Sequence, residues 1–432
     1  MAEEVVAASK SVTSTGSITP QRSRQEELSS LGLILALLFI AAAVISRKPE
    51  LIFRAQFWGD EATWFADAYM NGALHAFLQP QAGYLCVASK LALLPALHVP
   101  LLYAPVVFGL FAAGVHALMA GFLLTTRLAH VANLQLRALL CILWVILPNA
   151  GEIDSLNNTQ WMLAALGVAV LVSSPPRTIA WRTFDLVSIC LVSVTGPFCV
   201  LLFPLAIVWW LMRRSNWTIV LACIFAAGSC VQLLTLRHAL SPCRPREIIS
   251  PLLARLSAGQ IFLFGTLNGG NILPHATINT AAVTPLAILI VIAGVSVTVY
   301  ALLRGPAELK LFIVFAVLVF AASIRRLHCD PGWDWQSMMT VGYAIRYWYI
   351  PRLAVFAIFV WMIGKQRPTW VRGTATAAIL LIAASAFAHW RYPAWPYQDF
   401  RRYARAFEQA AKGTPISIPV NPPGWKIVLV KH

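Results

Sequence analysis

The segment LGLILALLFIAAAVI, Leu31–Ile45, decides the fold class of this chain. Every residue in it is apolar, and the charged pair Arg47-Lys48 follows closely. A signal peptide would begin nearer the N-terminus and would end in a small-residue cleavage pattern, which this segment lacks. We therefore predict that it is the first of several transmembrane helices. The polar stretch before it, residues 1–30, is predicted to be a disordered cytoplasmic tail.

The composition of the whole chain supports the same class. Of its 432 residues, 59% are hydrophobic and only 12% are charged, and the mean hydropathy is +0.71. A soluble protein of this length could not bury so much apolar surface, so we predict an all-α polytopic membrane protein. The formal net charge of +16 fits basic cytoplasmic loops and the binding of phosphorylated membrane lipids. Nucleic acid is not an expected partner, because no basic stretch is long enough to follow a phosphate backbone.

Transmembrane helices need about 20 apolar residues, and fewer where flanking residues reach the interface. On this basis we expect about 11 spans, near residues 31–46, 84–124, 138–150, 159–174, 183–195, 197–212, 217–235, 281–303, 309–324, 350–364 and 373–389. The stretch 84–124 is too long for one span, and Pro95, Pro100 and Pro105 interrupt it. If both of its halves cross, every later loop changes side. If it crosses once, the other half is broken or interfacial.

The distribution of basic residues favours a single crossing of 84–124. The inside loops are then 125–137, 175–182, 213–216, 304–308 and 365–372. They contain many arginines and one acid, Glu308, as the positive-inside rule expects. The membrane domain covers 31–390, and its external loops are 47–83, 151–158, 236–280 and 325–349. Residues 391–432 are predicted to be a short periplasmic tail, in which the proline-rich stretch Pro415–Trp425 is extended and packs on the external face.

The first polar motif that points to chemistry is Gly59-Asp60-Glu61, in the first external loop. Two adjacent carboxylates beside a membrane are costly unless they have a function. The following residues, Ala62–Leu78, are rich in aromatic side chains and suit a helix that lies at the interface, with its aromatic residues in the headgroup layer. A second interpretation is that the two acids cap this helix, and both roles can coexist.

A second polar cluster lies in the short external loop 151–158 and just after it. Glu152-Ile153-Asp154 places two carboxylates on one side of an extended segment, an arrangement that suits a metal ion or sugar hydroxyls. Asn157-Asn158-Thr159-Gln160-Trp161 adds amide groups. The alternative is a solvated turn between two helices.

The third cluster lies in and around the loop 325–349. Arg346 is followed by three aromatic residues, Tyr347-Trp348-Tyr349. An arginine there can pair with a lipid phosphate while its aromatic neighbours pack on a sugar or acyl chain. The alternative is an interfacial aromatic belt with a snorkelling arginine. His328 is a candidate proton relay, or a plain hydrogen-bonding residue.

The acidic pair before an expected interfacial helix, together with Glu152-x-Asp154 in the second external loop, resembles the GT-C glycosyltransferases. These are polytopic enzymes that use polyprenyl-phosphate-linked sugars at the outer face of the membrane. The Trp-Trp-Asp motif of oligosaccharyltransferases is absent, Trp333-Asp334-Trp335 does not replace it, and the large soluble C-terminal domain of that branch is missing. These departures argue against protein N-glycosylation.

The resemblance implies a role for each of the candidate residues. Asp60 would be the general base that deprotonates the acceptor hydroxyl, and Glu61 would orient the acceptor or tune Asp60. Arg346 would hold the leaving phosphate. Glu152 and Asp154 would bind the sugar or an optional divalent ion, Mg²⁺ or Mn²⁺. The remaining substrate-binding candidates are Tyr347, Asn158, Gln160, Trp161 and His328.

The expected function is transfer of a sugar from a polyprenyl-phosphate donor to a periplasmic acceptor, such as a lipid-linked or surface polysaccharide. The expected location is a bacterial inner membrane, with the N-terminus in the cytoplasm and the C-terminus in the periplasm. Two alternatives remain open at this point: an O-antigen or exopolysaccharide polymerase, and a transporter or flippase of lipid-linked saccharide. A transporter would need charged residues along mid-membrane faces, where Lys90 is nearly the only basic side chain.

Overall fold

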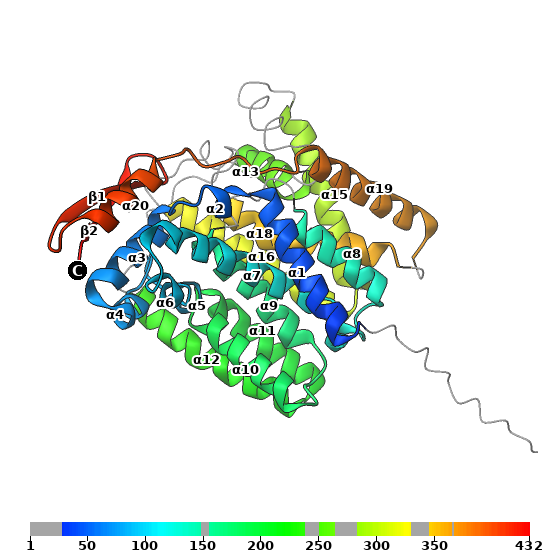
Figure 1. Ribbon diagram of the computed structural model, residues 1–432. Helices are drawn as coiled ribbons and strands as arrows, with labels where there is room; N and C mark the ends of the chain where they lie inside the picture. The colour runs from blue at the N-terminus through cyan, green and yellow to red at the C-terminus, as the bar shows by residue number, and fades with distance from the viewer. Residues whose placement is uncertain (1–27, 148–154, 238–249, 264–282, 330–344, 365–366) are drawn as a thin grey trace, which may run out of the picture.

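The computed structural model describes residues 28–147, 155–237, 250–263, 283–329, 345–364 and 367–432. Over these ranges the chain is mostly helical, and a two-stranded sheet lies near its C-terminus (Figure 1). The predicted tail up to residue 27 and the acidic pair Glu152 and Asp154 lie outside the described residues.

Seven helical segments within the described ranges are long and apolar enough to cross a membrane. They are α1 (Ser30–Arg47), η1 with α7 (Leu101–Phe122), α12 (Asn216–Leu236), α15 (Val283–Arg304), α16 (Ala307–Cys329), α18 (Ile345–Met362) and α19 (Thr369–Ala388). Shorter helices lie among them: α8 (Leu134–Val145), α9 (Thr159–Val172), α10 (Ile179–Ser193), α11 (Phe198–Arg213) and α13 (Ser250–Ser257). This arrangement is consistent with the predicted all-α membrane bundle.

The proline-containing stretch 84–124 contains one helix of membrane length. Two short helices, α5 (Val87–Lys90) and α6 (Leu93–Ala96), come first, and η1 (Leu101–Tyr103) then leads into α7 (Ala104–Phe122). Pro105 lies in the first turn of α7, where its missing N–H has no partner to lose. The buried Lys90 ammonium donates to the carbonyl oxygens of Ala76 and Gln79, at 2.7 and 2.6 Å.

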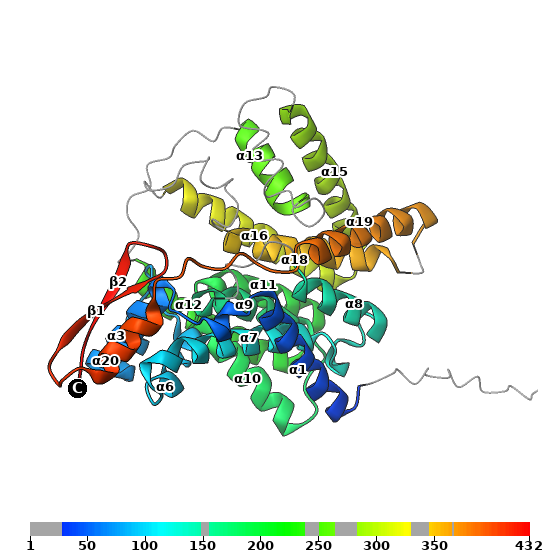
Figure 2. The same ribbon diagram turned by 45° about the horizontal axis from the view of Figure 1, so that its top comes forward.

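A second hydrophobic core, separate from that of the bundle, forms at one end of the molecule. It joins α3 (Gly59–Asn71) and α4 (Ala73–Leu78) to α20 (Phe400–Gln409) and the hairpin of β1 (Pro415–Val420) and β2 (Trp425–Val430). Phe57 lies at its centre, with ring centroids 5.0 Å from Phe65 and 5.4 Å from both Phe108 and Phe400. Segments from the two ends of the sequence are thus packed together, as Figure 2 shows for α3 and the strands.

The C-terminal segment has more structure than an extended tail. Pro415–Val420 and Trp425–Val430 pair as antiparallel strands, and the Trp425 indole lies against Gly59. A Cβ atom at Gly59 would lie 2.6 Å from Cε3 of Trp425, so only glycine allows this close approach. The hairpin therefore packs on the residue next to Asp60.

The aromatic residues of α3 do not form an exposed face for lipid headgroups. Trp64 and Phe65 are each only 3% exposed. The Trp64 indole bonds to Gln81 and lies beside the Lys90 ammonium, and the Phe65 ring packs on Phe57 and Phe108. The exposed apolar side chains of α3 and α4 are instead Met70, near the end of α3, and Leu74 and Leu78, on α4. The prediction of an aromatic face in the headgroup layer is wrong for Trp64 and Phe65, because they pack against residues distant in the sequence.

Two buried helices, α9 and α18, run from this end of the bundle to the opposite end. Every residue of α9 is buried, and so are most residues of α18. Their first turns lie beside α3, and their last turns line a cavity at the far end. With a rise of 1.5 Å per residue, the two ends are about 20 Å apart.

Candidate active site

Asp60 and Glu61 lie in the first turn of α3, since the helix begins at Gly59 rather than at Ala62. A helix N-terminus favours nearby negative charge, so both carboxylates gain from the unpaired N–H groups of this turn. Their side chains nevertheless differ in exposure and in partners. Glu61 is only 3% exposed, whereas Asp60 is half-buried.

Glu61 connects two backbone segments. Its Oε1 accepts the Asn157 backbone N–H at 3.2 Å, and the backbone N–H groups of Leu156 and Trp58 also bond to its carboxylate. Trp58 is the N-cap of α3, so the bond back to it is the Glu half of a capping box. Burial raises the pKa of Glu61 to about 7, against the effect of these bonds. Glu61 is therefore a positioning residue that fixes the start of α3 to the short helix η3 (Leu156–Asn158).

Asp60 is oriented through both of its carboxylate oxygens. Oδ1 accepts from Nε2 of Gln81 at 2.8 Å, and Oδ2 accepts from Nδ2 of Asn157 at 2.8 Å. Burial raises the pKa of Asp60, and the positive charge of Arg346 acts in the opposite direction. Hydrogen bonds therefore fix the orientation of the Asp60 carboxylate, which stays partly accessible and is a stronger base than an ordinary aspartate.

A tight turn supplies one of these amide groups. Gln81 and Tyr84 pair through their backbones at 2.8 and 3.1 Å, and the residues between them, Ala82 and Gly83, have φ of 50° and 92°. Glycine adopts such a conformation without steric cost. Nε1 of Trp64 donates to Oε1 of Gln81 at 3.2 Å, which turns the Gln81 NH₂ group toward Asp60.

Gln160 and Trp161 enter the site from the first turn of α9. Nε2 of Gln160 donates to the Asn157 carbonyl oxygen at 3.1 Å, and the Gln160 side chain also hydrogen-bonds to Tyr84. The ring of Trp161 lies perpendicular to that of Tyr347, with centroids 5.7 Å apart. The start of α9 is thus joined to the 81–84 turn and to α18.

Arg346 and Tyr347 complete the site from the first turn of α18. Cζ of Arg346 lies 5.0 Å from the centroid of the Tyr347 ring. Burial raises the pKa of Tyr84, the nearby Tyr347 adds to the shift, and the charge of Arg346 opposes it. Because Arg346 acts on both Asp60 and Tyr84, all of these groups belong to one cluster.

The structure thus brings together Asp60, Glu61, Gln160, Trp161, Arg346 and Tyr347 out of the predicted site residues. Asn158 is 2% exposed and donates from Nδ2 to Ser155 Oγ at 2.8 Å, so it supports the loop from within. His328 belongs to the last turn of α16, and its side chain lies outside the described part of the structure, as do Glu152 and Asp154. Over the described ranges, no three His, Cys, Asp or Glu residues are grouped to hold a metal ion.

Sequence reasoning did not single out Gln81 and Tyr84, although both lie within this cluster. The available signal was the Ala82-Gly83 pair, which favours a tight turn and so brings its two flanking residues together. It could not show that this turn lies against Asp60, because that contact depends on tertiary packing.

Comparisons with protein-family models, curated proteins and solved structures gave no match to this chain. The chemical interpretation of the site follows from its geometry. A half-buried carboxylate with a raised pKa can remove a proton from a hydroxyl. A nearby guanidinium can stabilise negative charge that develops on a phosphate. The aromatic rings and amide groups around them can bind a polar, ring-shaped molecule.

Proposed function

We propose that this protein is a membrane glycosyltransferase that moves a sugar from a polyprenyl-phosphate-linked donor to an acceptor hydroxyl. The observation that carries the proposal is the convergence of Asp60 and Arg346 from distant segments on one polar site at an end of an apolar bundle. The resemblance to GT-C enzymes, with about 11 spans, supports the same assignment.

In this mechanism Asp60 accepts the proton of the acceptor hydroxyl as its oxygen attacks the anomeric carbon of the sugar. The bond between that carbon and the phosphate oxygen breaks, and its electron pair leaves with the phosphate. Arg346 stabilises the charge that grows on this leaving group, where a fixed cation has its largest effect. Gln81 and Asn157 hold the carboxylate in place before the reaction.

The surrounding residues bind the sugar and the lipid. Tyr347 is half-buried and offers an aromatic face for the sugar ring. Trp161 and Gln160 are buried and support the site from behind, because the Trp161 ring lies edge-on to Tyr347 and the Gln160 side chain bonds to Tyr84 and Asn157. Glu61 acts indirectly, through the backbone of Asn157. If Glu152 and Asp154 bind Mg²⁺ or Mn²⁺, as the resemblance allows, the ion would assist phosphate binding.

The proposed acceptor is a lipid-linked or surface polysaccharide at the periplasmic face of a bacterial inner membrane. This assignment places the N-terminus in the cytoplasm and the C-terminus in the periplasm. It follows from the excess of arginine in the loops at the opposite end of the bundle from Asp60.

The test uses the purified full chain and a panel of polyprenyl-phosphate hexoses, with release of polyprenyl phosphate as the readout. Asp60→Asn keeps the shape of the side chain but removes the base, so turnover should fall by about 10²–10⁴-fold while donor binding is retained. Asp67→Asn is the matched control. Asp67 lies on the same helix, bonds to Asn71 and His75 near the surface, and should leave turnover unchanged.

Turnover within threefold of the wild type in Asp60→Asn would show that Asp60 is not the base. If the wild-type chain translocates the lipid-linked sugar across vesicles without transferring it, and Asp60→Asn does the same, a flippase replaces the enzyme.

A further inference from the structure

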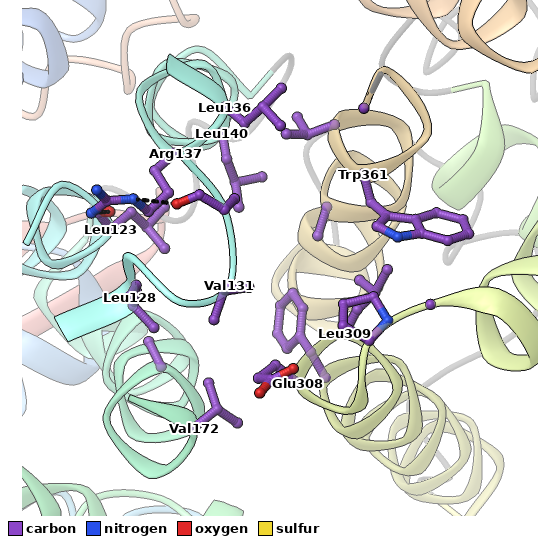
Figure 3. Close-up of a pocket in the computed structure, with 18 of the residues that line it drawn as sticks. Leu123, Leu128, Val131, Leu136, Arg137, Leu140, Val172, Glu308, Leu309 and Trp361 are labelled. Carbon is purple, nitrogen blue, oxygen red and sulfur yellow. Dashed lines mark hydrogen bonds between the residues drawn. The ribbon is translucent and has the colours of Figure 1, made fainter. Parts of the chain in front are cut away.

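A cavity of about 700 Å³ lies at the end of the bundle opposite to Asp60. Its walls come from the segment 123–133, α8 and α9 on one side, and from the end of α15, α16 and α18 on the other. Figure 3 shows Arg137 and Trp361 on these facing walls, with Glu308 between them at one edge. The volume is within the usual range for a ligand site, about 300–1,000 Å³.

Most of the cavity wall is hydrocarbon. Leu128, Val131, Leu140, Val172 and Leu309 point toward the space from both sides (Figure 3). Such a surface gains free energy when it is covered by an apolar group such as an acyl chain, and it offers little to a small hydrophilic molecule.

Three arginines line the same cavity: Arg137, Arg304 and Arg367. Arg137 is buried and donates to the carbonyl oxygens of Leu123, Thr125 and Ala132, which carry no formal charge. In the part of the chain that the structure describes, no carboxylate lies within 4 Å of Arg304 or Arg367. Arg367 instead lies over the ring of Trp361, at 4.1 Å.

The acid that lines this cavity, Glu308, does not neutralise these arginines. Its carboxylate pairs with Arg213, which is not a lining residue, and lies 3.7 Å from Nε2 of His130. The cavity therefore combines a hydrocarbon wall with a net positive charge.

We propose that this cavity binds an anionic phospholipid, with an acyl chain against the leucine and valine side chains and the phosphate near Arg304 and Arg367. Apolar walls give no advantage to a soluble anion. Arg304 and Arg367, which have no described carboxylate within 4 Å, give no advantage to an uncharged lipid. Each basic residue near an anionic headgroup strengthens binding by about fivefold. The cavity is about 20 Å from Arg346, so it is distinct from the proposed donor site and does not depend on it.

The experiment measures lipid binding to the purified full chain in detergent, by native mass spectrometry during titration with phosphatidylglycerol or phosphatidylcholine. We expect one molecule of phosphatidylglycerol to bind per chain, and to bind more tightly than phosphatidylcholine does. In the double variant Arg304→Gln/Arg367→Gln its affinity should fall by about 25-fold. The control Arg177→Gln/Arg372→Gln removes two exposed arginines that do not line the cavity, and should stay within twofold of the wild type.

A second variant tests the apolar part of the site. Ala169→Trp places a large ring into the cavity from α9 without changing its charge, and should reduce phosphatidylglycerol binding at least as much as the double variant. Equal binding of phosphatidylcholine, or no loss in either variant, would overturn the proposal. Displacement of phosphatidylglycerol by millimolar inorganic phosphate would also overturn it, because the site would then be a simple anion site.

Discussion

The two ends of α9 and α18 carry polar groups that are held in opposite ways. At the first end, both oxygens of Asp60 accept hydrogen bonds from amide side chains of other segments. At the second end, Arg304 and Arg367 line a hydrocarbon cavity, and no described carboxylate lies within 4 Å of either. The same pair of apolar helices thus supports a closed polar network at one end and an open cationic cavity at the other.

This difference separates two kinds of function. A closed network orients a reacting group before the substrate arrives, which lowers the cost of reaching a charged transition state. An arginine that has no carboxylate nearby can instead form an ion pair with an anionic group of a ligand. The first end is therefore suited to chemistry, and the second to holding a lipid.

The largest effect should come from the buried ion pair of Arg127 and Asp185, which lies at the cavity end of the bundle, opposite to Asp60. Nη1 and Nη2 of Arg127 donate to the two oxygens of Asp185 at 2.9 and 2.8 Å, and Nε1 of Trp217 donates to Oδ2 of Asp185 at 2.9 Å. Asp185→Ala would leave a buried guanidinium unpaired, so the free energy of unfolding should fall by about 3–5 kcal/mol. Denaturant titration in mixed micelles measures this loss.

The control for this variant is Asp67→Ala, which breaks an exposed pair with His75 and should cost at most about 1 kcal/mol. Equal losses in the two variants would show that the Asp185 pair does not stabilise the cavity end. Arg304→Gln/Arg367→Gln should leave the stability within about 0.5 kcal/mol. This result would show that Arg127 stabilises the fold, whereas Arg304 and Arg367 do not.

The second largest effect is expected at the acidic end, the end of the bundle that holds Asp60 and Glu61. Arg346→Gln removes the positive charge that acts on Asp60 and lowers its pKa, so turnover in the polyprenyl-phosphate assay should fall by about 10²–10³-fold. Arg325→Gln is the control, since Arg325 is an exposed arginine near the end of α16. If both variants lose activity equally, Arg346 contributes only to the general electrostatic field.

Much of the acidic site could be predicted because loops on one side of a membrane protein share a surface. Asp60 and Arg346 belong to two predicted external loops, and Gln160 closely follows a third, 151–158. The predicted topology places all three residues on the same side, and the structure brings them together. Their mutual arrangement could not be predicted. Whether a carboxylate accepts from amide side chains, as Asp60 does, or from backbone amides, as Glu61 does, depends on packing that a helical pattern does not specify.

Contacts between distant segments account for most of what the sequence did not reveal. No local pattern around Gly59 indicates that Trp425 packs on it. In the same way, the positive-inside rule identified Arg137, Arg304 and Arg367 as loop charges, but it contains no information about a cavity between them.

A smaller effect, specific to pH, is expected for Glu61. Its pKa in the folded chain is about 7, above the ordinary value of 4.5, so ionisation costs more in the folded state than in the unfolded state. The wild type should therefore lose stability as pH rises from 4.5 to 7, by up to about 3 kcal/mol, and show no further change from this group above pH 7. Glu61→Gln is neutral throughout and lacks this loss.

The measurement is the difference in unfolding free energy between Glu61→Gln and the wild type at several pH values. This difference should move in favour of the variant between pH 4.5 and 7 and then level off. Lost hydrogen bonds only add a constant offset, so the slope is the informative quantity. A flat difference would mean that burial does not raise the pKa of Glu61 in the folded chain.

The smallest effect tests whether the two ends are independent. Gly59→Ala adds a Cβ atom 2.6 Å from the Trp425 ring, so the hairpin must shift, at a cost of about 1–3 kcal/mol. Gly114→Ala on α7 is the control, because open space surrounds that position and alanine favours a helix. Gly59→Ala should increase proteolysis of the C-terminal hairpin and slow sugar transfer, while phosphatidylglycerol binding at the other end stays unchanged. If lipid binding weakens as well, α9 and α18 transmit strain between the two ends, and neither site can be treated separately.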